Sequence, residues 1–310
     1  MVDRLRVGVA GAGVFGGYHA DKYSELDNVD LVAVFDTEVA SAKRLADKHG
    51  AQSHDNFETF LDSVDAVSIA TPATTHFDYG MRAAQAKKSA YIEKPLAVNS
   101  SDGRLLVKAF KEAGVALVVG HQERHILERL GVLDFSGAVS SIEFARCGAS
   151  SGRCMDVSVV YDLMIHDLDF AALLGLTNPS MVDVSGDRDE TIATLQFPGG
   201  ASASFVASRK SQSPKRLMKL RSADTVVEID FFARKITKDG VQRGFDDVSS
   251  EDISDPLLLN VEKFVSLSQN NGIVGPGASA GETSVAMAEK IEFALNGPED
   301  LFDYKQRLSA

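Results

Sequence analysis

Near its amino end the chain reads Arg6-Val7-Gly8-Val9-Ala10-Gly11-Ala12-Gly13-Val14-Phe15-Gly16, an apolar run that leads into a glycine turn. A strand, a G-x-G-x-x-G turn and a helix in this order are typical of a dinucleotide-binding unit. Gly11 permits the tight turn, Gly13 lets the backbone approach a pyrophosphate, and Gly16 lets the helix pack on the sheet. The helix then presents free N–H groups and a positive partial charge to the phosphates. The turn therefore predicts a bound dinucleotide.

Up to Gly120, apolar runs of strand length alternate with amphipathic stretches of helical length. The expected strands are Arg6–Ala10, Leu31–Phe35, Ala66–Ala70, Ala90–Ile92 and Ala116–Gly120. The expected helices are Val14–Leu26, Val39–His49, His76–Ala86 and Ser101–Ala113. Apolar strands that alternate with helices indicate a parallel sheet covered on both faces. We therefore expect an α/β fold, with a Rossmann-type doubly wound parallel sheet over residues 1–120.

Asp36 ends the second expected strand, twenty residues after Gly16. A carboxylate at this place accepts hydrogen bonds from the ribose hydroxyls of the adenosine and repels a 2′-phosphate. Thr37 and Glu38 add no arginine that would hold such a phosphate. The sequence therefore favours NAD over NADP, the alternative being that Asp36 only closes a turn.

Two further segments are expected at the carboxyl edge of the sheet, where open α/β folds bind their ligands. Thr71 and Pro72 follow the strand Ala66–Ala70 and are expected to line the nicotinamide side, whereas His76 either contacts the cofactor or only begins the next helix. The run Tyr91-Ile92-Glu93-Lys94-Pro95 places Lys94 where a proton donor would meet the cofactor. The cofactor-binding residues expected are Gly11, Gly13, Val14, Phe15, Gly16, Asp36, Thr71, Pro72, His76, Glu93 and Lys94.

After Gly120 the pattern changes to strands joined by short turns. The expected strands are Met181–Ser185, Thr191–Phe197, Ala201–Ser208, Leu217–Ser222 and Thr225–Phe231. The expected helices are Val160–Leu174, Pro256–Leu267 and Glu282–Leu295, and Gly272–Gly281 is expected to be a surface loop. Successive strands with short connections predict a largely antiparallel sheet. Residues 121–310 are therefore expected to form a second, α+β domain.

The helix Val160–Leu174 carries Asp162 and His166, which are i and i+4 and share one α-helical face. A histidine held by a carboxylate is suited to accept the proton released when an alcohol loses hydride. The catalytic residues expected are therefore Lys94, His166 and Asp162, and with the glycine turn they predict hydride transfer. Taken alone, His166 is also compatible with a surface or capping position.

With these motifs in order, the chain resembles the glucose–fructose oxidoreductase / inositol dehydrogenase (Gfo/Idh/MocA) family from about Leu5 to Leu295. The motifs are Gly11–Gly16, Thr71–His76, Glu93-Lys94-Pro95, Gly120-His121-Gln122-Glu123-Arg124 and Asp162–His166. The resemblance implies that Lys94 and His166 flank the reacting carbon, with Asp162 as partner. It also implies that the open face of the second sheet forms homodimers or homotetramers. The substrate-binding residues expected are Lys94, Gln122, Arg124, Arg153, Asp162 and His166. His125 departs from the pattern, since many members carry an aromatic residue there.

Within the family, the segment from Arg153 to Asp167 is similar to the branch that oxidises the 3-hydroxyl of UDP-N-acetylglucosamine to a ketone. An aminotransferase then acts on that ketone in lipid A precursor synthesis, so this resemblance implies a UDP-linked sugar as substrate. Arg124, Arg146 and Arg153 are expected to converge on its phosphates. The run Ser208–Arg221 holds six cationic residues and no acidic one, and it is either a further contact for the anion or a solvated strand edge. The alternatives are a dehydrogenase of a free sugar or inositol, and a dinucleotide-binding sensor without catalysis.

The 310 residues carry a net charge of −12. This charge disfavours nucleic acid and anionic membranes as partners, because both require clustered cations. The amino end lacks a secretory signal, and no run approaches the roughly 20 apolar residues that span a bilayer. Only Cys147 and Cys154 occur, so no metal site is expected and both are expected to be free thiols. A cytoplasmic oxidoreductase is the expected class.

Overall fold

The computed structural model describes residues 4–133, 138–150, 152, 155–248, 254–270, 272 and 276–297. The chain divides into two compact units. Unit 1 comprises Met1–Gln122 and Asp255–Glu282, and unit 2 comprises Glu123–Ser254 and Thr283–Ala310. The sequence-based division assigned everything after residue 120 to the second domain. Asp255–Glu282 belongs to unit 1 instead, because the helix that begins there buries apolar side chains against the first sheet.

Unit 1 is built on a six-stranded sheet in the order β3-β2-β1-β4-β5-β6, in which every neighbouring pair is parallel. Its strands are β1 (Leu5–Ala10), β2 (Val29–Phe35), β3 (Gln52–His54), β4 (Ala66–Ile69), β5 (Ser89–Ile92) and β6 (Leu117–Val119). β4 and β5 are buried along their whole length, so the predicted doubly wound parallel sheet is confirmed. The strand order reverses between β1 and β4, and folds of this kind bind ligands at such a point.

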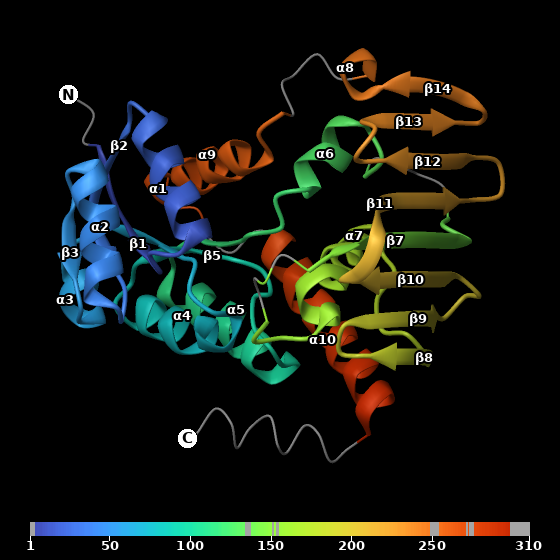
Figure 1. Cartoon of the computed structure of the whole chain (residues 1–310), viewed down its shortest axis with the longest axis horizontal. Helices are drawn as coiled ribbons and strands as arrows, with labels where there is room; N and C mark the ends of the chain where they lie inside the picture. Colours follow the sequence, from blue (N-terminus) through green and yellow to red (C-terminus); the bar gives the residue numbers. More distant parts are fainter. Residues whose placement is uncertain are drawn as a thin grey trace. The chain divides into compact units, whose positions relative to one another are not determined.

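Helices cover both faces of this sheet (Figure 1). They are α1 (Val14–Glu25), α2 (Val39–His49), α3 (Phe57–Asp62), α4 (His76–Gln85), α5 (Ser100–Ala113) and α9 (Pro256–Gln269). Tyr23 of α1 and Phe264 of α9 are fully buried in one core with Val9, whereas α4 and α5 pack on the opposite face. A Cβ at Gly80 of α4 would lie 2.6 Å from Leu106 of α5, so the small residue lets these helices pack closely.

Local sequence signals set several helix ends in this unit. Asn99 accepts a hydrogen bond from the backbone N–H of Asp102 at 2.9 Å and begins α5. Asp255 accepts one from Leu258 at 2.9 Å and begins α9. Each cap satisfies one of the backbone donors that the start of a helix leaves without an intrahelical partner.

Unit 2 is built on an eight-stranded sheet in the order β14-β13-β12-β11-β7-β10-β9-β8. Its strands are β7 (Ser141–Ala149), β8 (Met181–Asp187), β9 (Glu190–Gln196), β10 (Ser202–Ser208), β11 (Lys210–Arg221), β12 (Val226–Asp230), β13 (Lys235–Lys238) and β14 (Val241–Gly244). Neighbouring strands are antiparallel except β7 and β10, which are parallel. The largely antiparallel sheet is therefore confirmed, although the sequence did not predict the central strand β7.

One face of this sheet is apolar and packs on helices. Phe144, Phe205 and Met218 are buried on it, and Phe144 lies 6.2 Å from Phe170 of α7 between ring centroids. The helices of this unit are α6 (Arg124–Arg129), a π-helix (Val160–Met164), α7 (Ile165–Leu173) and α8 (Phe245–Val248). A further helix, α10 (Pro276–Asn296), runs across the boundary between the units. None of the described helices is long and apolar enough to cross a membrane.

The start of α10 corrects one expectation. Pro276–Gly281 was expected in a surface loop, but it forms the first turns of the helix. Proline suits a first turn because the N–H that it lacks has no intrahelical partner there. A Cβ at Gly281 would lie 3.2 Å from Val119 of β6, so this glycine serves close packing. Residues 273–275 of the expected loop lie outside the described residues.

Candidate active site

The glycine turn joins the end of β1 to α1, at the point where the strand order reverses. Gly11 has φ 95°, and a Cβ on it would lie 2.6 Å from the backbone oxygen of Ala70. A Cβ on Gly16 would lie 1.7 Å from the backbone oxygen of Gly11. By contrast, a Cβ on Gly13 would meet no described atom within 4 Å. Two of the glycines are therefore required by the fold, and the third leaves the space that an approaching pyrophosphate needs.

The start of α1 completes the cradle for a dinucleotide. Gly13 is the N-cap residue, and among the described residues no side chain caps this end of the helix. The first N–H groups of a helix have no intrahelical partner and attract anions. Val14, at this end, is half exposed. The residues of the turn therefore fit a dinucleotide phosphate.

Asp36 follows β2 and lies beside the glycine turn. One carboxylate oxygen accepts a hydrogen bond from the backbone N–H of Ala12 at 2.7 Å, and the other accepts one from the N–H of Glu38 at 2.8 Å. A carboxylate has about four lone-pair positions, so both oxygens keep capacity for ribose hydroxyls. The two backbone bonds hold the carboxylate in place next to the turn.

The loop after β4 is tied to the segment after β5 by His76. This histidine is the first residue of α4 and is 1% exposed. Its Nδ1 lies 2.7 Å from the carbonyl oxygen of Pro95, and its Nε2 lies 3.0 Å from the carbonyl oxygen of Thr71. Thr71 and Pro72 thus lie at the carboxyl end of the sheet, as expected, and the imidazole links the two loops that carry the predicted nicotinamide and lysine positions.

Glu93 is buried at the end of β5 within a polar network. Its Oε1 lies 2.9 Å from His19 Nε2 and accepts a hydrogen bond from Gln122 at 3.2 Å, while Oε2 accepts one from the backbone N–H of Lys94 at 3.2 Å. The network continues from His19 to Ser68 at 3.2 Å. Burial favours the neutral carboxyl, but the hydrogen bond to His19 and the charges of His19 and Lys94 lower the pKa of Glu93 below its ordinary value. Glu93 is therefore a buried carboxylate that helps to fix the backbone at Lys94 through this hydrogen bond.

Lys94 is half-buried and lies two residues after the end of β5, and its peptide bond to Pro95 is cis. Gln122 donates a hydrogen bond to Oε1 of the carboxylate whose Oε2 accepts the backbone N–H of Lys94. Two of the predicted substrate-binding residues of unit 1 are therefore neighbours of one buried carboxylate.

In unit 2, Asp162 and His166 lie on one continuous helical segment, but its first turn differs from the expectation. Val160–Met164 is π-helical, and α7 begins at Ile165. Asp162 therefore lies in the π turn and His166 in the first turn of the α-helix, which changes the α-helical i and i+4 relation on which the prediction was based. Such π turns inside helices are frequent at functional sites.

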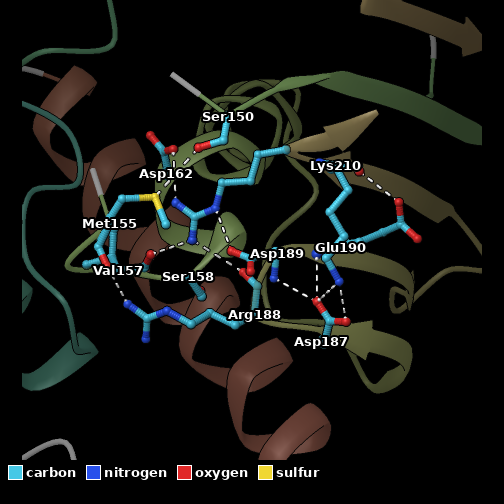
Figure 2. Close-up of polar contacts among 12 residues, drawn as sticks. Ser150, Met155, Val157, Ser158, Asp162, Asp187, Arg188, Asp189, Glu190 and Lys210 are labelled. Atoms are coloured by element: carbon cyan, nitrogen blue, oxygen red, sulfur yellow. Dashed lines mark hydrogen bonds and ion pairs between the residues drawn. The ribbon is translucent and has the colours of Figure 1, made fainter. Parts of the chain in front are cut away.

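Arg209 lies between β10 and β11 and forms an ion pair with Asp162 of this helical segment. Sequence analysis did not single it out. Its Nη1 lies 3.6 Å from Asp162, its Nε donates to Asp189 at 2.9 Å, and its Nη2 donates to the carbonyl of Val157 at 2.8 Å. These three partners are labelled in Figure 2. Arg209 is 6% exposed. One buried cation thus joins the π turn to the β8–β9 turn.

Two further arginines, half-buried Arg124 and buried Arg146, hold the carboxylates that follow His166 in α7. Arg124 Nε donates to Asp169 at 2.6 Å. Arg146 donates to Asp167 at 2.7 Å and to Glu123 at 2.8 Å. Burial opposes the charge on Arg146, but Asp167 and Glu123 outweigh it and raise its pKa. These arginines, expected to meet substrate phosphates, are thus engaged with carboxylates that fix the helix carrying His166.

Two positions of the sequence analysis lie outside the described residues, namely Arg153 and Cys154. Cys147 is half-buried, and burial raises the pKa of its thiol. Within the described part of the chain, no cluster of three or more His, Cys, Asp or Glu residues is placed to hold a metal ion.

Comparison with known proteins identifies the family of the chain. Residues 5–121 match the model of the GFO_IDH_MocA oxidoreductase family, NAD-binding Rossmann fold. The scyllo-inositol 2-dehydrogenase (NAD(+)) of Bacillus subtilis is 30% identical over 237 residues, which cover 68% of this chain and 69% of that protein. The chain belongs to the Gfo/Idh/MocA oxidoreductase family.

A second relative of this family matches nearly the whole chain. The UDP-N-acetylglucosamine 3-dehydrogenase of Acidithiobacillus ferrooxidans is 29% identical over 307 residues, which cover 94% of this chain and 97% of that protein. Its solved structure has a TM-score of 0.85 and covers 94% of this chain and 98% of its own. The predicted enzyme class is confirmed: this Gfo/Idh/MocA protein is an NAD(P)-dependent dehydrogenase, and its relatives include sugar and polyol dehydrogenases.

Proposed function

We propose that the protein oxidises the 3-hydroxyl of UDP-N-acetylglucosamine, or of a related nucleotide sugar, to a ketone with NAD. The observation that carries this proposal is the extent of the likeness. The A. ferrooxidans UDP-N-acetylglucosamine 3-dehydrogenase matches 94% of the chain, most of unit 2 included, whereas the B. subtilis scyllo-inositol 2-dehydrogenase matches 68%. Because a dinucleotide fold serves many reactions, likeness beyond that fold is what favours a particular substrate.

The proposed reaction breaks the C3–H and O3–H bonds of the sugar. NAD, held by the glycine turn, supplies the acceptor for the hydride. His166 accepts the hydroxyl proton, and Asp162 orients its ring. Lys94 hydrogen-bonds the reacting oxygen while that proton passes to His166. Gln122, Arg124 and Arg153 complete the proposed substrate contacts, with Arg153 as a phosphate ligand.

The preference for NAD over NADP rests on Asp36. Its carboxylate is held by the backbone N–H groups of Ala12 and Glu38. A 2′-phosphate beside it would bring two negative groups together at a place where Thr37 and Glu38 offer no cation. The ribose of NAD would instead donate its hydroxyls to the carboxylate.

The proposed assembly is a homodimer or homotetramer formed through the open face of the unit 2 sheet. Ile192, Val206, Ala145 and Leu217 are paired across β9, β10, β7 and β11 in one row. Residues directly opposite on neighbouring strands point to the same face, which here is the face away from buried Phe144. Ile192 is 48% and Leu217 is 40% exposed, so a second copy would cover apolar surface. A cytoplasmic location is proposed because the chain has only two cysteines.

Deuterium labelling tests both the substrate and the carbon. UDP-N-acetylglucosamine that carries deuterium at carbon 3 should transfer the deuterium to NAD. Mass spectrometry should then find the reduced cofactor one mass unit heavier than the one formed from unlabelled substrate. The matched control is the same nucleotide sugar deuterated at carbon 4, which should transfer none. Transfer from carbon 4 alone would contradict the proposed position, and no cofactor reduction with either compound would contradict the proposed substrate.

A second candidate function is oxidation of an inositol or free sugar, favoured by the 30% identity to the scyllo-inositol 2-dehydrogenase. The absorbance of the reduced nicotinamide, measured with each candidate substrate in turn, should distinguish the two candidate functions. Efficient oxidation of scyllo-inositol, myo-inositol or glucose, with UDP-N-acetylglucosamine inert, would select this second function.

A further inference from the structure

A cationic cavity opens in unit 2 beside the helix that carries Asp162. Its volume is about 160 Å³. The charged side chains that line it are Arg146, Arg209, Lys215, Arg216 and Asp162. Four cationic residues and one carboxylate therefore line this space.

The four cations differ in how well their charge is compensated. Arg146 holds both Asp167 and Glu123, and Arg209 holds Asp162 and Asp189. Each of these buried guanidinium groups has two carboxylate partners. They form the wall of the cavity, and their charge is already neutralised within the protein.

Arg216 and Lys215 are less well compensated. The carboxylate that Arg216 contacts, Glu123 at 2.7 Å, is the one already shared with Arg146. Burial and repulsion from Arg146 outweigh Glu123 and lower the pKa of Arg216. Lys215 is exposed, and within the described part of the chain no carboxylate forms an ion pair with it. These adjacent residues thus present positive charge that an incoming anion would neutralise.

The mouth of the cavity adds an aromatic surface. Phe232 lines it and is 60% exposed, and the guanidinium carbon of Arg216 lies 5.8 Å from the centre of its ring. Exposed aromatic rings next to cations are the usual platform on which nucleobases stack. A phosphoryl group at Lys215 and Arg216 would bring an attached nucleoside to this ring.

We infer that this cavity binds a nucleoside diphosphate group, with its phosphates on Lys215 and Arg216 and its base on Phe232. A planar guanidinium donates paired hydrogen bonds to a phosphate, and an ammonium adds a point charge. Asp162 and Leu163 form another wall of the cavity, so a sugar attached to the diphosphate would extend toward the predicted proton acceptor. The inference rests on the proposed function in taking UDP as the group bound, and within the run Ser208–Arg221 it assigns the phosphates to Lys215 and Arg216.

Calorimetric titration with UDP tests the cavity without turnover. The dissociation constant should rise about ten- to hundredfold in Lys215→Ala and in Arg216→Gln, the scale of a lost charged hydrogen bond. The matched control is Lys219→Ala, which removes one lysine of the same strand that pairs with Glu228 and lies outside the cavity lining. It should change UDP binding less than twofold. Because Lys215 is exposed, its variant should fold normally and decides the outcome even if Arg216→Gln is unstable.

The proposed contact between the base and Phe232 is tested by titrating Phe232→Ala with UDP, uridine and inorganic phosphate. This variant should weaken UDP and uridine about tenfold and leave inorganic phosphate unaffected. Unchanged UDP affinity in Lys215→Ala and Arg216→Gln would overturn the inference. Inorganic phosphate that binds as tightly as UDP would also overturn it, because the cavity would then be a site for free phosphate.

The two proposals fail in different ways. If UDP binds with the stated dependence but UDP-N-acetylglucosamine is not oxidised, the proposed function fails and the binding site stands. If UDP-N-acetylglucosamine is oxidised but UDP affinity is the same in the variants, the binding site fails and the proposed function stands.

Discussion

His19 Nε2 lies 2.9 Å from Glu93 Oε1, and both side chains are almost completely buried. His19 belongs to α1, the helix that begins at the glycine turn, and Glu93 accepts the backbone N–H of Lys94. The contact therefore connects the predicted dinucleotide helix to the predicted catalytic segment within unit 1. Its strength is measurable in the stability of the protein.

Replacing His19 by glutamine should destabilise the protein by about 3 kcal/mol near neutral pH, because a buried carboxylate loses its partner. The folded pKa of Glu93 is lowered, so its contribution to stability is present above the unfolded pKa and is lost as pH falls through the folded value. Without His19 that pKa should rise. The difference in unfolding free energy between the two proteins, measured in urea, should therefore shrink as pH falls toward about 4. The same change at half-buried His54 is the control, and an equal loss there would contradict a special role for His19.

Lys94→Ala should lower turnover by roughly 10²- to 10⁴-fold, the scale of one acid–base group. Its affinity for NAD, measured by fluorescence of the reduced cofactor, should change little, because the glycine turn and Asp36 are untouched. Lys108→Ala is the matched control, since Lys108 is 67% exposed on α5 and pairs with Glu112. Near-normal turnover of the Lys94 variant on its substrate would remove Lys94 from the proposed mechanism.

His166→Ala and Asp162→Asn should show strongly non-additive losses in turnover, because the two side chains are proposed to act as one unit. The structure provides a control, since Asp189 is the other carboxylate on Arg209. Asp189→Asn should combine additively with His166→Ala. If it couples to His166 as strongly as Asp162 does, Asp162 acts through Arg209 and not directly on the histidine.

The open face of the unit 2 sheet should hold the subunits together. A glutamate at Ile192 places a charge among the paired residues Val206, Ala145 and Leu217 and should shift the protein toward the monomer. Light scattering after size-exclusion chromatography measures the change. Val39→Glu, at a residue 57% exposed on α2, should leave the assembly intact. A natural enzyme that is already monomeric would contradict this use of the face.

Most of the fold of unit 1 could be predicted, because most of its strands are largely apolar and strands alternate regularly with helices. β3, with the sequence Gln52-Ser53-His54, carries no apolar signal and was missed for that reason. The α9 helix was predicted nearly to its ends, but its place in unit 1 depends on packing that no local pattern encodes. Long-range contacts such as that of Asn260 with Tyr91 at 2.9 Å become visible only in the folded chain.

Strand β7 shows why part of the candidate site escaped prediction. Ile142 and Phe144 alternate with polar residues as a strand should, but the next inward position is Arg146, whose burial depends on Glu123 and Asp167. From the sequence alone, an arginine is assigned to the surface, because the carboxylates that allow its burial are not known. Arg209 escaped notice for the same reason, since it was grouped with the exposed cations of its run. The carboxylates Asp167 and Asp169 beside His166 were the available signal that arginines would be needed nearby.

Cofactor choice should depend mainly on Asp36. Asp36→Ala should weaken NAD by roughly 1–3 kcal/mol through lost charged hydrogen bonds, and it should relieve the repulsion of a 2′-phosphate. Part of that loss would come from the turn itself, because Asp36 also accepts the N–H of Ala12 at 2.7 Å. Asp36→Asn separates the two effects, since the amide oxygen can still accept this bond while the charge is gone. The ratio of kcat/KM for NADP to that for NAD should therefore rise in both variants, with the smaller loss of NAD affinity in Asp36→Asn. Equal kcat/KM for the two cofactors in the natural enzyme would show that the carboxylate does not select between them.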